Sequence, residues 1–176
     1  MTAPSWHYAL LDEPGEDIRA IVQEIPGRWG RMPPLSRAVV VEAGRLLQQA
    51  GLLPEERRFN KAGTRVGLIG ATRYGSLAVD TAFAATMQSQ PQLASPALFG
   101  YTLANIPLAE AANHYGLVGP VFALYAEDEP LQRAVTEARR WLQNRDVDFM
   151  LACEFDDLSR NGALALTVNF TIVNQL

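Results

Sequence analysis

Apolar residues recur along this chain in two patterns, one at helical spacing and one in short continuous runs. Between residues 36 and 50 they return every three or four positions, which predicts a helix with one packed face. Ser36 is suited to cap its start and Gly51 to cap its end. The same reasoning predicts further helices over residues 16–24, 76–87, 106–115 and 130–145.

The continuous apolar runs are short and rich in β-branched residues, as in buried strands. They predict strands over residues 65–69, 121–126, 149–153 and 163–173, with residues 5–11 as a short edge strand. Strands separated by helices favour an α/β fold, here a mixed sheet of about five strands covered by helices. The last two strands are expected to form an antiparallel hairpin at one edge.

Composition is typical of one globular domain. The chain has 176 residues, of which 48% are hydrophobic and 19% charged. A net charge of −4 gives no basic surface for nucleic acid. No apolar run approaches the roughly 20 residues that a membrane span needs, and no secretory signal is recognisable. The sequence therefore predicts a cytoplasmic protein that does not bind nucleic acid and has no membrane span.

Candidate nucleophiles and metal ligands are scarce. Cys153 is the single cysteine, so no internal disulfide can form, and with His7 and His114 it cannot make a Cys/His metal cluster. Cys153 stands in an apolar strand, where cysteine usually behaves as a small buried hydrophobe. His114 is expected to pack at a helix end. We therefore expect no metal and no cofactor.

Two acidic clusters are candidates for a functional site. Glu127, Asp128 and Glu129 precede a helix, where negative charge compensates the helix dipole. They could instead form a carboxylate site that binds a cation or acts as acid and base. The second cluster, Glu154, Asp156 and Asp157, ends a predicted strand. Because strand ends and helix starts meet at one edge of an α/β sheet, both clusters could line one cleft and hold a cation weakly.

Several segments, in order, resemble the N-terminal half of the β-ketoacyl synthases. They are residues 31–52 (RMPPLSRAVVVEAGRLLQQAGL), 65–75 (RVGLIGATRYG), 95–119 (SPALFGYTLANIPLAEAANHYGLVG) and 133–155. The resemblance implies half of a thiolase-type fold, a single ketosynthase-like N-terminal domain over residues 1–176 in which residues 1–30 vary. The nearest subfamily is that of ketosynthase-like N-terminal domains in bacterial aryl-polyene and related lipid clusters.

The resemblance also implies where catalysis should occur. In the family the nucleophilic cysteine lies nine positions past the Gly of a Gly-Pro pair, which here begins at Gly119. That position is Asp128, and a carboxylate cannot form the thioester that condensation uses. The family's two catalytic histidines come from a C-terminal half that the sequence to Leu176 does not contain. We therefore expect no β-ketoacyl-[acyl-carrier-protein] synthase (acyltransferase) activity, and the chain resembles a pseudoenzyme.

Association is the function that the resemblance favours. Condensing enzymes of this family pair through one strand, and the matching residues here are Val121, Phe122, Ala123, Leu124, Tyr125 and Ala126. The expected role is a non-catalytic partner in fatty-acid or polyketide biosynthesis, as a homodimer or as a heterodimer with an active ketosynthase in the manner of a chain length factor. Acyl carrier protein is a candidate partner. The alternatives are an acyl-chain or small-molecule binding protein and an enzyme that uses the acidic residues.

Overall fold

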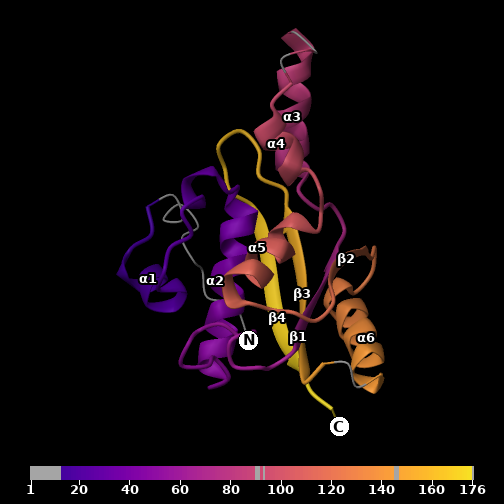
Figure 1. Ribbon diagram of the computed structural model, residues 1–176. Helices are drawn as coiled ribbons and strands as arrows, with labels where there is room; N and C mark the ends of the chain where they lie inside the picture. Colours follow the sequence, from indigo (N-terminus) through magenta and orange to yellow (C-terminus); the bar gives the residue numbers. More distant parts are fainter. Residues whose placement is uncertain (1–12, 90–91, 93, 145–146, 176) are drawn as a thin grey trace.

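The computed structural model describes residues 13–89, 92, 94–144 and 147–175 (Figure 1). The helices and strands predicted from residue 16 onward occur in the predicted order, with two short helical elements in addition. They are α1 (Glu16–Val22), the single 3₁₀ turn η2 (Trp29–Arg31), α2 (Pro34–Gln49), β1 (Val66–Thr72), α3 (Leu77–Ser89), α4 (Pro96–Tyr101), α5 (Ile106–Tyr115), β2 (Val121–Tyr125), α6 (Pro130–Gln143), β3 (Phe149–Asp157) and β4 (Leu166–Val173).

The sheet confirms the predicted α/β class. Its strand order is β2-β1-β3-β4, in which β1 runs parallel to both β2 and β3, and β4 pairs antiparallel with β3 as a hairpin. Gly70 lies at its middle, opposite Ala123 on one side and Cys153 on the other. The described residues contain four strands rather than about five. The strand expected over residues 5–11 lies outside the described residues.

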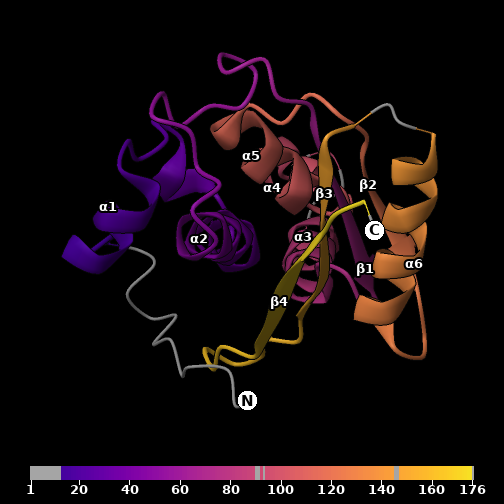
Figure 2. The same ribbon diagram turned by 90° about the horizontal axis from the view of Figure 1, so that it is seen from below.

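Helices cover both faces of the sheet, as the view in Figure 2 shows. Helices α2 and α5 lie on one face over the larger hydrophobic core, and α1 packs outside α2. Helix α6 covers the other face with a smaller core that includes Ile69, Met150 and Leu142. This arrangement leaves β2 and β4 as the two edges of the sheet. No helix in the described part of the chain has the length and apolar character that a membrane span requires.

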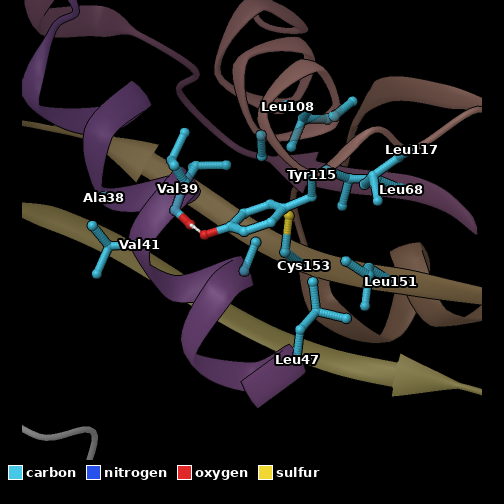
Figure 3. Close-up of a cluster of buried hydrophobic side chains, with 14 of the residues drawn as sticks. Ala38, Val39, Val41, Leu47, Leu68, Leu108, Tyr115, Leu117, Leu151 and Cys153 are labelled. Atoms are coloured by element: carbon cyan, nitrogen blue, oxygen red, sulfur yellow. Dashed lines mark hydrogen bonds between the residues drawn. The ribbon is translucent and has the colours of Figure 1, made fainter. Parts of the chain in front are cut away.

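Helix α2 is buried over most of its circumference and begins earlier than its pattern predicts. Pro33 precedes its first turn as the N-cap and Pro34 occupies the first helical position, where the missing N–H costs nothing. Ser36 is therefore not the cap but a buried residue inside the first turn. The backbone carbonyl of Val40 accepts a 2.9 Å hydrogen bond from the Tyr115 hydroxyl, which joins α2 to the end of α5 (Figure 3).

Further boundaries differ from the sequence predictions, and one helix was not predicted. Strand β3 continues beyond Cys153 to Asp157, and α3 ends at Ser89, two residues later than the helix predicted over residues 76–87. Helix α4 was not predicted; Ser95 caps it by accepting the Leu98 N–H. Together α3 and α4 project beyond the end of the sheet, where they are the uppermost elements in Figure 1.

Candidate functional site

Strands β1, β2 and β3 are parallel, so their carboxyl ends meet at one edge of the sheet. Three segments follow these ends: the loop from Thr72 to Ser76, the acidic run Glu127–Asp128–Glu129, and the β3–β4 hairpin. In open α/β sheets this is the edge where functional side chains usually gather. The side chains at these three strand ends are therefore the first candidates for a site.

A buried carboxylate organises this edge. Asp156 Oδ1 accepts hydrogen bonds from the Thr72 hydroxyl at 2.5 Å and from the backbone N–H groups of Arg73 at 3.1 Å, Tyr74 at 2.7 Å and Gly75 at 3.1 Å. Successive N–H groups that converge in this way form a nest for an anion. Here the chain fills its own nest, so Asp156 fixes the loop after β1 and is not available to a ligand.

The acidic run is exposed and is held to the same loop. Arg73 Nε donates a 2.6 Å hydrogen bond to the backbone carbonyl of Glu127, so the ends of β1 and β2 are joined. Glu129 takes a left-handed conformation with φ of 46° and precedes α6, and Asp128 is exposed beside it. The three carboxylates point to solvent at a helix start, which is the dipole-compensating arrangement.

The two acidic clusters do not form the shared cleft that was considered from the sequence. Glu154 accepts from the Asn169 side chain at 2.6 Å, Asp156 fills the nest, and Asp157 Oδ1 accepts from the Ser159 N–H at 2.9 Å. The described residues contain no group of three or more His, Cys, Asp or Glu side chains that could hold a metal ion. The hypothesis of a weak cation site is therefore wrong for this part of the chain.

Strand β2 forms one edge of the sheet and offers its outer side for pairing. It pairs with β1 and with no other strand in the described residues. Its side chains alternate: Val121 and Ala123 pack toward the α2 and α5 face, and Phe122 and Leu124 pack toward α6. Tyr125 is 71% exposed at the end of the strand. An apolar edge with unpaired N–H and C=O groups invites a further strand.

An open pocket of about 320 Å³ lies beside this edge strand. Residues from three places line it: Ala123, Leu124 and Tyr125 of β2, the loop from Thr72 to Ser76, and Asp80, Thr102 and Ala104 next to α3 and α4. Burial raises the pKa of the Asp80 carboxyl. Neither acidic cluster takes part in the lining.

The base of α4 is anchored to the body by a polar cluster. The Tyr101 hydroxyl donates to Glu110 Oε1 at 3.2 Å, and Arg28 lies 2.6 Å from Glu110 Oε2. Burial and the nearby carboxylate raise the pKa of Tyr101. Because Glu110 is buried in α5, this cluster fixes where α4 leaves the domain.

Cys153 and His114 both serve packing. Cys153 is buried in the middle of β3 with its sulfur toward the Tyr115 ring (Figure 3), and burial raises the pKa of its thiol far above the ordinary value. His114 lies in the last turn of α5, 3.1 Å from the Val22 carbonyl and in edge contact with Tyr115. His7, the second histidine considered from the sequence, lies outside the described residues.

Sequence reasoning missed two features of this region. The first is Asp156 as the anchor of the β1 loop, which the cluster Glu154–Asp156–Asp157 obscured. The second is the exposed apolar surface of α3 and α4, although a signal for it exists: Asp80 is the one charged residue between Leu77 and Leu103.

Comparison with known proteins places the chain in a family. The profile of the β-ketoacyl synthase N-terminal domain matches residues 7–170. Curated proteins include no significant match to the sequence.

Solved structures of ketosynthases resemble the fold. The ishigamide ketosynthase/chain length factor matches with a TM-score of 0.64 and 18% identity, over 92% of this chain and 48% of that chain. A β-ketoacyl synthase from Burkholderia phymatum STM815 matches with a TM-score of 0.64 and 17% identity, over 77% of this chain and 33% of that one. A ketosynthase in complex with its chain length factor from Xenorhabdus doucetiae matches with a TM-score of 0.57 and 16% identity, over 80% and 57% of the two chains.

The chain thus spans 33% to 57% of the length of these three structures, and at such identities the likeness concerns the fold alone. Because the family profile covers most of its length, the chain belongs to the β-ketoacyl synthase N-terminal domain family and has the thiolase-like fold of that family.

Proposed function

We propose that this protein is a non-catalytic, chain-length-factor-like subunit that pairs along β2 with an active ketosynthase in fatty-acid or polyketide biosynthesis of the aryl-polyene type. The observation that carries the proposal is the free apolar edge at β2, next to an exposed Asp128 at the position that matches the family's nucleophile. Two of the similar structures pair a ketosynthase with a chain length factor, which supports the same role.

The residues at the end of β2 argue against condensation chemistry. The acidic run occupies the turn where the family needs a thiolate near a helix start. Cys153, the one thiol of the chain, is fully buried in β3 and its pKa is raised, so it cannot replace that nucleophile. The same carboxylates remain compatible with a surface that contacts another protein.

Association is the first test. We expect this chain and an active ketosynthase of the same organism, co-expressed as a pair, to migrate as a stable heterodimer in size-exclusion chromatography with light scattering. Tyr125→Asp adds charge at the exposed end of β2, and Ala123→Asp adds it at the middle; both should weaken the complex at least tenfold.

Thr136→Asp is the matched control because it adds the same charge on the exposed face of α6. Ala123 is partly buried, so its variant also needs a folding check by circular dichroism. A chain that stays monomeric with every ketosynthase of the organism would contradict the proposal. So would a complex that neither β2 variant weakens.

Activity is the second test. The purified protein, mixed with acyl carrier protein and with malonyl and acyl substrates, should show no condensation or decarboxylation above background. Turnover that Asp128→Asn abolishes would instead identify an enzyme that uses the acidic residues.

The pocket beside β2 supports a second candidate, the binding of an acyl chain or other small molecule. Its walls combine apolar side chains from β2 with the Thr72–Ser76 loop, and its volume of about 320 Å³ is at the lower end for ligand sites. Native mass spectrometry of the purified protein distinguishes the candidates, because a retained lipid that Ala104→Phe displaces would favour binding.

A further inference from the structure

A second hollow, called the charged pocket below, lies where α5 meets the segment after α1 and the loop between α2 and β1. Its volume is about 250 Å³, and it is lined by residues 24–28, Arg58, Glu110, Asn113 and His114. Figure 2 shows α1, α2 and α5 gathered on the side of the sheet opposite α6. The charged pocket shares no residue with the pocket beside β2.

Helix α5 positions two guanidinium groups at the charged pocket. Arg28 lies 2.6 Å from Glu110 Oε2, and Arg58 Nη2 donates a 2.9 Å hydrogen bond to the backbone carbonyl of Asn113. Because positions 110 and 113 are three apart, both contacts lie on one face of the helix. Each contact engages one terminal nitrogen of a guanidinium group, which has five N–H donors in all. Donors on both groups therefore remain for a ligand.

The buried carboxylate of Glu110 holds Arg28 in place before any ligand binds. Glu110 is 7% exposed and also accepts a 3.2 Å hydrogen bond from the Tyr101 hydroxyl, whereas the Arg28 side chain is half exposed. A buried carboxylate depends strongly on its charged partner. The guanidinium is therefore fixed from within the protein and open to solvent on its other side, and such preorganisation lowers the cost of binding.

Groups that attract a cation line the same pocket. The carboxylate of Glu24 is exposed, and it lies near the His114 ring, since it raises the pKa of that ring while Arg58 lowers it. His114 Nε2 lies 3.1 Å from the Val22 carbonyl, which can only accept, so Nε2 carries the proton and Nδ1 of the neutral ring is an acceptor. Helix α5 also ends here, and the partial negative charge of a helix C-terminus favours a cation.

We propose that the charged pocket binds a small zwitterion of the class of the free α-amino acids. Arg28 and Arg58 hold its carboxylate, and Glu24 with the acceptors at the end of α5 holds its ammonium group. With His114 neutral, two guanidinium groups and two carboxylates leave the lining without net charge, so it complements a ligand that carries one charge of each sign. This site goes beyond the proposed function and does not depend on pairing along β2.

The size and polarity of the charged pocket limit the ligand further. Its volume of about 250 Å³ lies below the range of sites for drug-sized ligands, which begins at about 300 Å³. Ile25 and Pro26 are the two lining residues with apolar side chains, and the others are charged, polar or glycine. An acyl chain would find little apolar surface there. The zwitterion that fits has a short side chain, as in glycine, alanine or serine.

Calorimetric titration of the full chain with glycine, L-alanine and L-serine tests the proposal. Propionate and ethylamine are the matched probes, because they correspond to L-alanine without its ammonium group and without its carboxylate. We expect at least one of the amino acids to bind and to raise the midpoint of thermal unfolding with increasing concentration. Propionate and ethylamine should bind at least tenfold more weakly than L-alanine.

Three variants locate the site. Arg58→Gln removes guanidinium donors and Glu24→Gln removes the exposed carboxylate, and each should weaken amino-acid binding at least tenfold. Asn113→Trp fills the pocket from an exposed position and should abolish binding. Arg133→Gln is the matched control, because it removes an exposed arginine from α6. Circular dichroism checks the fold, and if Arg58→Gln unfolds, the other two variants decide.

The contrary outcomes are distinct. Failure of all three amino acids to bind overturns the proposal. Propionate that binds as tightly as L-alanine would indicate an anion site, and ethylamine that does so would indicate a cation site; either contradicts a zwitterion site. Binding that persists in Glu24→Gln and Asn113→Trp, or that is also lost in Arg133→Gln, shows that the amino acid does not depend on this pocket. None of these results bears on the heterodimer along β2, so the proposed function is tested separately.

Discussion

Asp156 Oδ1 and Thr72 Oγ1 lie 2.5 Å apart, although 84 positions separate the two residues in the sequence. They meet because β1 and β3 are parallel neighbours that end at the same edge. The Thr72 hydroxyl also accepts from the Gly75 N–H at 2.6 Å, so the two side chains together satisfy the turn that follows β1. The wall of the pocket beside β2 depends on this contact.

Asp156→Ala should be strongly destabilising. Removal of the carboxylate leaves the N–H groups of Arg73, Tyr74 and Gly75 without their shared acceptor. Hydrogen bonds to a charged acceptor contribute about 1.5–3 kcal/mol each in net terms, but they are not additive in one network. We expect the free energy of unfolding, measured in urea, to fall by about 2–4 kcal/mol.

Asp156→Asn keeps one acceptor oxygen, so its free energy of unfolding should fall by roughly half as much as that of Asp156→Ala. The double variant with Thr72→Val should be less destabilised than the sum of the single variants, because both substitutions remove the same contact. Glu154→Gln serves as the control for loss of a carboxylate from β3. If Asp156→Ala and Glu154→Gln lowered the free energy of unfolding equally, the hydrogen bonds in the nest would contribute no more to stability than an ordinary carboxylate on β3.

Gly67→Ala should also destabilise, because the strand is packed too closely for a side chain. A Cβ atom there would overlap the Met150 side chain and lie 2.9 Å from the Pro120 carbonyl oxygen. Overpacking of this kind costs about 1–3 kcal/mol. Gly27→Ala is the matched control, since nothing lies within 4 Å of its Cβ position and its φ is not left-handed. A thermal melt in which both variants match the unmodified chain would contradict the packing argument.

The sequence predicts the elements of this fold better than their ends. The strand predicted over residues 65–69 and the helix predicted over residues 106–115 both occur, as β1 (Val66–Thr72) and α5 (Ile106–Tyr115). They are predictable because burial of one or both faces of an element produces an apolar run or a helical spacing in the sequence. The start of α2 does not follow, because Pro34 and Ser36 are both good residues for a helix start and tertiary packing decides between them. Likewise β3 extends to Asp157 through polar residues whose partners lie in other elements.

The candidate site is predictable only where it leaves a pattern of apolar or polar side chains in the sequence. The edge strand at Val121–Tyr125 could be located from the family resemblance and its apolar run. The role of Asp156 could not, since the three N–H groups that hold it are backbone groups and leave no trace in the side-chain pattern. The shared acidic cleft failed because the carboxylates of Glu154, Asp156 and Asp157 each find a partner close to β3.

The thiol of Cys153 should be unreactive in the native protein and should make stability fall at alkaline pH. Burial raises the pKa of the thiol, so the folded state keeps it protonated while the unfolded state ionises near its ordinary value of 9.0. The contribution of the protonated thiol to the free energy of unfolding is therefore fully present below pH 9 and is lost above it. At pH 10 the loss is about 1.4 kcal/mol for one such group.

Urea unfolding between pH 7 and pH 10 measures this loss. The free energy of unfolding should fall less steeply with pH in Cys153→Ala than in the unmodified chain. Tyr115, whose pKa burial also raises, leaves a residual slope that begins near its ordinary value of 10.0. Labelling with a thiol reagent at pH 8 should require unfolding. Rapid labelling of the native protein would contradict the buried position of the thiol.

His114 should produce a separate loss of stability on the acidic side. Burial lowers its pKa and the nearby Arg58 lowers it further, whereas the hydrogen bond with the Val22 carbonyl and Glu24 raise it. The folded pKa lies below the ordinary value of 6.5, so its contribution is present above pH 6.5 and is lost as the pH falls through the folded pKa. Because the ring is only partly buried, the loss should be below about 1 kcal/mol.

His114→Gln isolates this contribution, since glutamine can still donate to the Val22 carbonyl but does not titrate. We expect its unfolding free energy in urea to change less between pH 7.5 and pH 5.5 than that of the unmodified chain. His7→Gln is the control, because His7 is the second histidine of the sequence. A slope that persists in His114→Gln and disappears in His7→Gln would assign the titration to the other ring. It would also show that the contact between α1 and α5 does not depend on the charge of His114.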